Sequence, residues 1–122
     1  MSPKDTGRLY ALARAGFGAG LLVAPAALGR PWIGAAADKP GAQIAIRGLG
    51  VRDVILGGIA AHVLDRGPVA ARAAQACAVA DLVDGVATLA AARSLPVTAY
   101  GVVALAFAGA ATGFGLSRSL AG

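Results

Sequence analysis

The stretch Val97–Leu116 reads VTAYGVVALAFAGAATGFGL, which is twenty residues without a charged side chain. At the helical rise of about 1.5 Å per residue, this length matches a hydrocarbon core of about 30 Å. Backbone amides in lipid must be satisfied within their own segment, so a run of this kind is expected to form a helix. The stretch therefore predicts a membrane-spanning helix in the last quarter of the sequence.

The composition of the whole chain favours the same class of protein. Of its 122 residues, 57% are hydrophobic and 14% are charged, and the mean hydropathy is +0.71. These values are too apolar for a soluble domain of this length. The chain also has 18 glycines, and small residues let helix backbones approach closely in lipid, where packing replaces the hydrophobic effect as the attraction between helices.

The charge and the reactive side chains exclude several function classes. A net charge of +5 would suggest nucleic acid in a soluble protein, but a nucleic-acid footprint needs a clustered basic face. Here the basic residues are dispersed near expected span ends, so we expect no nucleic-acid partner. Cys77 and His62 are the only cysteine and histidine, so we expect no disulfide, no metal site and no cofactor.

Four apolar segments account for the chain as a single transmembrane domain over residues 1–122. Prolines and charged residues mark their ends, which predicts spans at residues 7–28, 41–64, 68–93 and 96–118. Pro25 is expected to kink the first span near its end. The connections are short, which favours antiparallel neighbours. We therefore expect an all-α fold, an integral membrane four-helix bundle that runs up-down-up-down.

The basic residues also predict the orientation of this bundle. If both termini lie on one side, that side collects five basic residues, and the other side collects three. The first set is Lys4, Arg8, Arg66, Arg72 and Arg118, and the second is Arg30, Lys39 and Arg93. Because basic residues favour the cytoplasmic side, we expect a multi-pass protein with both termini in the cytoplasm.

Six charged residues fall at membrane depth, where ionisable groups are rare and need partners. They are Arg14 in the first span, Arg47, Arg52 and Asp53 in the second, and Asp81 and Asp84 in the third. We expect them to form one intramembrane charge network. An extended Arg14 side chain can reach Asp53 across the difference of about one helical turn in depth.

The spacing of the second and third spans predicts two further ion pairs. In an antiparallel pair of helices, residues at equal depth have residue numbers whose sum is nearly constant. Arg52 with Asp81, and Arg47 with Asp84, agree on this sum to within about two residues, or about 3 Å along the axis. We therefore expect the pairs Arg52–Asp81 and Arg47–Asp84.

Two interpretations of this network compete. Buried ion pairs can fix the register of the helices with little net gain in stability. Alternatively, the aspartates can bind a proton, a cation or a polar substrate group, as ionisable residues in spans often do. We favour the structural interpretation, because the nearby arginines oppose proton binding. Neither Asp81 nor Asp84 has a histidine, lysine or nucleophile expected beside it, so we expect no catalytic residues and no enzyme activity.

Glycine placement predicts the helix-packing faces. Gly16 with Gly20, and Gly109 with Gly113, form small-xxx-small pairs in the first and fourth spans. In the second span, Gly50 and Gly57 fall on one side of the helix. These seams can serve the core of the bundle or a partner protein, and we favour the internal role.

The segment Arg47-Gly-Leu-Gly-Val-Arg52-Asp53-Val-Ile-Leu-Gly57-Gly58 carries a resemblance. Its pattern R-x-x-G-x-R-D-x-x-L-G resembles the signature of small uncharacterised four-helix integral membrane proteins of bacteria, common in actinobacteria, which form a domain family of unknown function. The resemblance implies the same fold and a location in the bacterial plasma membrane. It implies no activity.

Two functions remain open. The first is a non-enzymatic integral membrane protein that acts as an accessory or scaffold subunit of a larger membrane complex, in contact with lipids and with other subunits or a second copy. The second is a small homo-oligomeric carrier or channel. In that case a polar site at the midplane would be formed by Arg47, Arg52, Asp81 and Asp84.

Overall fold

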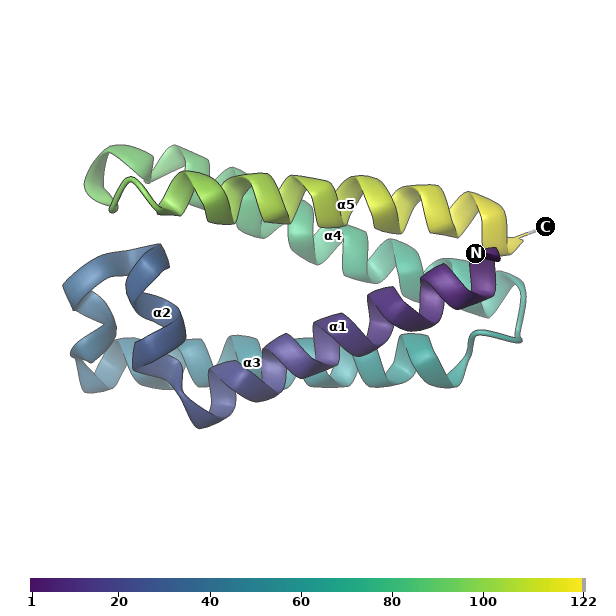
Figure 1. Ribbon diagram of the computed structural model, residues 1–122, viewed down its shortest axis with the longest axis horizontal. Helices are drawn as coiled ribbons and strands as arrows, with labels where there is room; N and C mark the ends of the chain where they lie inside the picture. Colours follow the sequence, from purple (N-terminus) through teal and green to yellow (C-terminus); the bar gives the residue numbers. More distant parts are fainter. Residues whose placement is uncertain (122) are drawn as a thin grey trace.

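The computed structural model describes residues 1–121, and these residues form an all-helical fold without strands (Figure 1). Five α-helices and two short 3-10 helices follow one another along the chain. In order they are α1 (Pro3–Val23), α2 (Pro25–Ile33), η1 (Gly34–Asp38), α3 (Pro40–His62), α4 (Pro68–Ala90), η2 (Ala92–Ser94) and α5 (Ala99–Ala121). The all-α class expected from the sequence is confirmed.

Proline marks the beginning of four of the five α-helices. It stands at the first turn of α1, α2, α3 and α4, where its missing N–H is one that a helix leaves unpaired in any case. The start of α1 has a capping box in addition. There the Asp5 N–H donates to the Ser2 hydroxyl at 3.1 Å, and the Ser2 N–H donates to the Asp5 carboxylate at 3.4 Å.

The first expected span does not continue to residue 28. Helix α1 ends at Val23, and the segment from Pro25 to Asp38 turns away from it by 103°. Pro25 has no N–H for the helical hydrogen bond and therefore ends α1, while its fixed φ suits the first turn of α2. The expected kink is thus a sharp bend, and α2 folds back toward the other helices (Figure 1).

The long helices associate mainly as two pairs, α1 with α3 and α4 with α5. Contacts between α3 and α4 are far less extensive, although these two helices are consecutive in the chain. The N-terminus, the α5 C-terminal end and the α3–α4 connection lie at one end of the molecule, and α2, η1 and η2 lie at the other (Figure 1). The connections between the long helices are therefore divided between the two ends of the molecule.

The α1–α3 pair is held at close range by glycines. A Cβ atom at Gly18 would lie 2.5 Å from the Gly50 carbonyl oxygen, and one at Gly57 would lie 2.5 Å from the Ala11 carbonyl oxygen. A Cβ atom at Gly50 would in turn lie 2.6 Å from the Gly18 carbonyl oxygen. Backbone thus packs directly on backbone along this seam, as small residues permit. Gly18 is the α1 glycine at the seam, and the sequence analysis did not name it.

The other glycines of the sequence analysis lie in different surroundings. Gly16 faces open space, so it does not take part in packing within this chain. Gly20 faces the Leu28 side chain of α2. On α5, Gly109 faces the Asp81 carboxylate, and Gly113 lies against Tyr10 and α4. The i, i+4 spacing identified small residues on α1 but not which face of α1 meets α3.

The buried side chains are mostly small and many exposed ones are large and apolar, which is the reverse of the distribution in a soluble protein. Most of the buried core consists of alanines, namely Ala11, Ala37, Ala60, Ala70, Ala71, Ala74, Ala78, Ala92, Ala99 and Ala110. Twenty large hydrophobic side chains are exposed, with examples on every long helix in Leu12, Phe17, Ile55, Val83 and Leu105. Meanwhile Arg14 and Asp53 are buried. Many large apolar side chains thus point outward, while two charged side chains lie in the core.

Two helices, α4 and α5, are long and apolar enough to cross a membrane, and the bent pair that begins with α1 gives a third segment if it counts as one span. Four such segments were expected. Helix α3 has sufficient length, but its 23 residues include Arg47, Arg52 and Asp53. Length and composition therefore identify two to three candidate membrane helices rather than four.

Candidate functional site

Five charged side chains from three helices meet in the interior and form what we call the charge network. Helix α1 contributes Arg14, α3 contributes Arg52 and Asp53, and α4 contributes Asp81 and Asp84. Their ion pairs connect them in the order Asp81, Arg14, Asp53, Arg52 and Asp84. Negative and positive groups therefore alternate along the network, which links α4 to α1 and α3.

Arg14 is the most enclosed cation of the network, with a side chain only 7% exposed. Its Nη1 donates to Asp53 Oδ1 at 3.0 Å, and its Nη2 donates to Asp81 Oδ2. Nη2 also approaches the Cys77 carbonyl oxygen at 3.2 Å, while Nε is buried without an acceptor. One guanidinium thus joins α1 to both α3 and α4. Charge-assisted hydrogen bonds of this kind are stronger than those between neutral groups.

Arg52 holds the outer part of the network. It donates through Nη1 and Nη2 to the two carboxylate oxygens of Asp84, at 3.2 and 2.6 Å, and its Nη2 donates to Asp53 Oδ1 at 3.1 Å. The forked contact with Asp84 is the bidentate geometry that a guanidinium favours with a carboxylate. The Arg52 side chain is 32% exposed, so this half of the network is more accessible than the half around Arg14.

Tyr10 extends the network to α5. Its hydroxyl lies 3.3 Å from Asp81 Oδ2, 3.1 Å from the Gly109 carbonyl oxygen and 3.3 Å from Arg14 Nη2. The hydroxyl can donate to Asp81 or to Gly109 and can accept from Arg14. The guanidinium carbon of Arg14 also lies 5.6 Å from the centre of the Tyr10 ring. Tyr10 is a site residue that the sequence analysis missed, because a lone tyrosine in an apolar helix carries no pattern.

The pairing differs from the expected one. Arg14 reaches Asp53, but the Arg52–Asp81 and Arg47–Asp84 pairs are not formed. The expectation treated α3 and α4 as direct neighbours along their whole length. Instead Arg14 of α1 pairs with Asp81. Arg52 of α3 pairs with Asp84, the next carboxylate along α4.

Arg47 lies outside the charge network. It is exposed, and its Nε donates to the Leu22 carbonyl oxygen at 3.2 Å. Because α1 ends at Val23, Leu22 is one of the carbonyls that a helix C-terminus leaves unpaired. Arg47 therefore caps the C-terminal end of α1. Its positive charge there also interacts favourably with the negative end of the helix dipole.

Polar contacts at the two ends hold the connections. Trp32 Nε1 donates to Thr88 Oγ1 at 3.0 Å, which ties α2 to α4 directly beside the network. At the opposite end, Lys4 Nζ lies 3.0 Å from the carboxylate of Asp65 in the α3–α4 connection. The hydrogen bond from Lys4 and its positive charge lower the pKa of the Asp65 carboxyl group.

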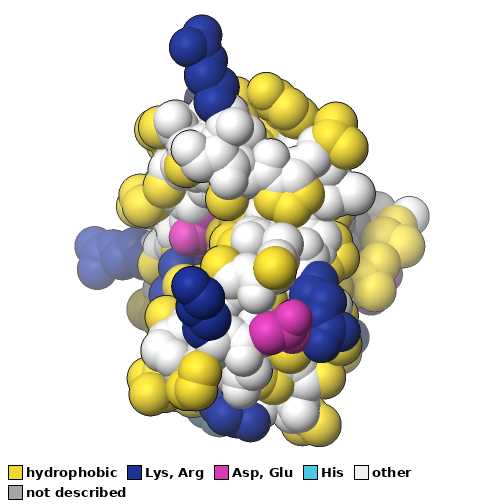
Figure 2. Space-filling model, turned by 90° about the vertical axis from the view of Figure 1, so that its left-hand side faces the viewer, with side chains coloured by type: hydrophobic (Ala, Val, Ile, Leu, Met, Phe, Trp, Pro, Cys, Tyr) yellow, Lys and Arg dark blue, Asp and Glu magenta, His cyan; other side chains and the backbone are white. Residues whose placement is uncertain are grey.

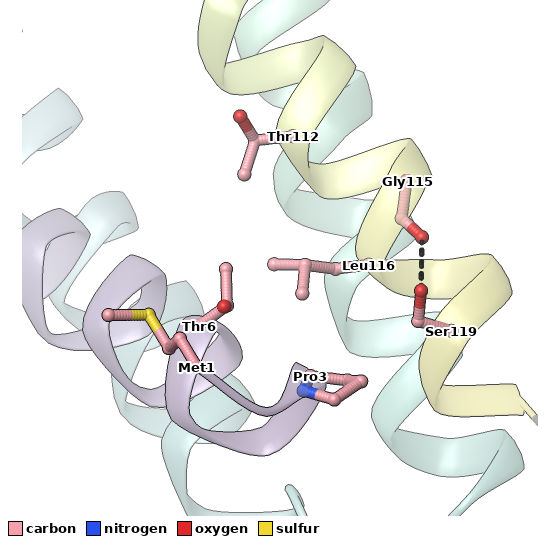
Figure 3. Close-up of a pocket in the computed structure, with 7 residues that line it drawn as sticks. All are labelled: Met1, Pro3, Thr6, Thr112, Gly115, Leu116 and Ser119. Atoms are coloured by element: carbon pink, nitrogen blue, oxygen red, sulfur yellow. Dashed lines mark hydrogen bonds between the residues drawn. The ribbon is translucent and has the colours of Figure 1, made fainter.

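Two hollows lie at the end that carries the termini. The larger measures about 360 Å³ and is open, between the start of α1 and the last turns of α5 (Figure 3). Its lining has no charged residue and consists of Met1, Pro3, Thr6, Thr112, Gly115, Leu116 and Ser119. The smaller measures only about 10 Å³ and touches Tyr10. Neither is lined by a charged residue of the network.

No protein-family model, curated protein or solved structure matches the chain. Residues 1–121 contain no group of histidine, cysteine or acidic side chains placed to hold a metal ion. The network can fix three helices in register and neutralise buried charge.

Proposed function

We propose that the protein is a non-enzymatic integral membrane protein whose four long helices, α1, α3, α4 and α5, cross the bilayer as an up-down-up-down bundle. The observation that carries this proposal is the inverse distribution of side chains. Large apolar residues cover the outside of all four helices, while Arg14 and Asp53 are buried among alanines and glycines. Lipid solvates the first set, and protein partners satisfy the second.

The contacts of its charged side chains explain how α3 can cross a membrane despite its composition. Arg52 and Asp53 are paired within the network, and the exposed Arg47 is bonded to the C-terminal end of α1. A charged side chain in a span is tolerated where it faces the bundle interior and is paired. Hydropathy alone counts these residues against α3, whereas their contacts support its place in the bundle.

The ends of the molecule support a transmembrane orientation. Figure 2 shows the end that carries α2, η1 and η2, with Lys and Arg side chains around an apolar surface. The opposite end holds both termini and the Lys4–Asp65 pair. Because the terminal end was expected to carry more basic residues, we place both termini in the cytoplasm. The family resemblance of the R-x-x-G-x-R-D-x-x-L-G segment implies a bacterial plasma membrane, and we adopt that location in the proposal.

An accessory or scaffold role fits this bundle best. The chain has little mass outside its long helices, and the charged groups of the network contact one another rather than a hollow. Several glycines face open space, among them Gly16, Gly58, Gly101 and Gly115, and small residues of this kind allow a neighbouring span to approach closely. A carrier would need a polar path through the bundle, and the two hollows do not extend to the charged residues.

Cysteine labelling tests the membrane topology. In a Cys77→Ser background, single cysteines replace Ala35 and Leu95 at one end and Arg66 at the other. We expect an impermeant reagent added outside intact cells to label positions 35 and 95 but not 66. Recovery of the protein in the soluble fraction, or labelling that requires the two termini on opposite faces, contradicts the four-span proposal.

Purification in mild detergent tests the accessory role. We expect a stoichiometric complex with another membrane protein. Leucine is placed at the open glycines, one position at a time. At one face the substitution should abolish the complex, without lowering the thermal stability of the purified protein. The open positions on the other helices serve as matched controls. A homo-oligomer that moves protons or ions across liposome membranes would instead support the carrier.

A further inference from the structure

The charge network contains more acidic than basic groups. Its carboxyl groups belong to Asp53, Asp81 and Asp84, and its guanidinium groups belong to Arg14 and Arg52. Within residues 1–121, the structure gives no ion pair between these carboxyl groups and a third basic side chain. If all five groups were ionised, one negative charge would remain without a counterion in the interior of the bundle.

An uncompensated buried carboxylate is too unfavourable to persist, and such a group takes up a proton instead. A metal cation is a poor alternative, because Na⁺ would need several oxygen ligands and a space of its own. The carboxylate oxygens already accept N–H groups from the two arginines, and neither of the two hollows described above is lined by a charged residue of the network. A proton requires neither ligand space nor a cavity.

The hydrogen bonds single out one of the three carboxyl groups. Asp53 is shared by two guanidiniums, and Asp84 faces the bidentate fork of Arg52. Asp81 pairs with one guanidinium nitrogen of Arg14, and its other neighbour is the Tyr10 hydroxyl. Of the three acids, Asp81 is therefore the one with the least positive charge around it.

Tyr10 also supplies an acceptor for a proton on Asp81. Its hydroxyl lies closer to the Gly109 carbonyl, at 3.1 Å, than to Asp81 Oδ2, at 3.3 Å. When the hydroxyl donates to Gly109, its oxygen is free to accept from a protonated Asp81.

We propose that the charge network is a proton-binding site that holds one proton, carried by the Asp81 carboxyl group and accepted by the Tyr10 hydroxyl. The groups that face Asp81 are Tyr10 and Arg14 from α1, Asp53 from α3, and Cys77 on its own helix, while α5 presents the backbone of Gly109. With this proton in place, the two remaining carboxylates balance the two guanidiniums. The inference rests on the proposed membrane location, which keeps water and counterions away from the network.

Infrared difference spectroscopy of the purified full-length protein at neutral pH tests the proposal directly. We expect the carbonyl stretch of one protonated carboxyl group in the wild type, its loss in Asp81→Asn, and its retention in the control Asp65→Asn, which changes an exposed loop carboxyl. Asp84→Asn should also lose the band, because removing another negative charge leaves the network neutral without the proton. A wild type without the band, or a band that survives in Asp81→Asn, overturns the proposal.

Two further measurements keep the test informative even if Asp81→Asn does not fold. The folding constant of the wild type should fall about tenfold per pH unit above the ordinary range of aspartate, because only the folded state holds the proton. Tyr10→Phe should move the loss of the band to lower pH, since the protonated acid loses its acceptor. A flat pH profile, or a shift of the band to higher pH in Tyr10→Phe, contradicts the assignment.

Failure of this inference is distinguishable from failure of the proposed function. Protein found in the membrane fraction with four spans but without a protonated carboxyl group leaves the proposed function standing and removes the proton site. Protein found in the soluble fraction removes the membrane proposal itself.

Discussion

Replacement of Gly18 by alanine tests the α1–α3 seam with a single methyl group. The new Cβ would lie 2.5 Å from the Gly50 carbonyl oxygen, 2.8 Å from the Val54 nitrogen and 2.9 Å from Asp53 Cβ. Ordinary van der Waals contact begins at 3.4 Å, so the two backbones must separate by about 0.9 Å. Two of these contacts are backbone atoms of a helix, and they cannot rotate away as a side chain can.

The expected loss of stability follows from this displacement. Overpacking of one methyl group in a rigid contact typically destabilises a protein by about 1 to 3 kcal/mol. The separation would also strain the 3.0 Å contact between Arg14 and Asp53, which crosses the same seam. Gly16→Ala is the matched control, because a Cβ there meets nothing within 4 Å. Alanine should stabilise that position in a helix by about 0.5 to 1 kcal/mol.

The assay is reversible unfolding of the two variants and the wild type in mixed detergent micelles, followed by circular dichroism. The order of stability should be Gly16→Ala, then wild type, then Gly18→Ala. Gly57→Ala should behave as Gly18→Ala does, since its Cβ would lie 2.5 Å from the Ala11 carbonyl oxygen. Equal stability of Gly16→Ala and Gly18→Ala would refute the close approach of α1 and α3.

The other predictions concern charged contacts. Arg52→Gln and Asp84→Asn should be coupled by about 0.5 to 3 kcal/mol in a double-mutant cycle of unfolding, because the two side chains share a bidentate contact. Arg47→Gln with Asp84→Asn should show no coupling, because Arg47 bonds to a backbone carbonyl outside the network. For Asp65, whose pKa Lys4 lowers, the stabilising contact is present at neutral pH and is lost as the pH falls through that lowered pKa. Lys4→Gln should raise the Asp65 pKa toward its ordinary value in an NMR titration, and an unchanged value would contradict the contact.

The helices themselves were largely predictable, and their bends were not. Most of the uncharged stretch at residues 97–116 lies in α5, which begins at Ala99, and Pro40 and Pro68 marked the beginnings of α3 and α4. Pro25 likewise indicated a break, because its ring removes a hydrogen bond whatever surrounds it. The bend angle of 103° depends on the helices against which α2 packs, and a lone proline in the sequence does not predict those contacts.

The members of the charge network were predictable to a greater extent than their partners. Charges in apolar helices need neutralisation, so their clustering follows from composition. The pairing depends on which helix lies opposite each carboxyl group. Here Arg14 of α1 occupies the position next to Asp81, and Arg52 pairs with Asp84 instead. A register argument that uses two helices cannot anticipate a third, and for the same reason it could not find Tyr10.

The alanine core has a consequence for how this protein tolerates change during evolution. In a soluble domain, the bulky interior varies little and the surface varies freely. Here the seam positions, such as Gly18 and Gly57, have no room for an added atom, whereas outward residues such as Ile55 and Val83 meet no tightly shaped neighbour. Among descendants of this sequence, we expect the smallest side chains to be the most constrained. The largest should exchange among leucine, isoleucine, valine and phenylalanine almost without selection.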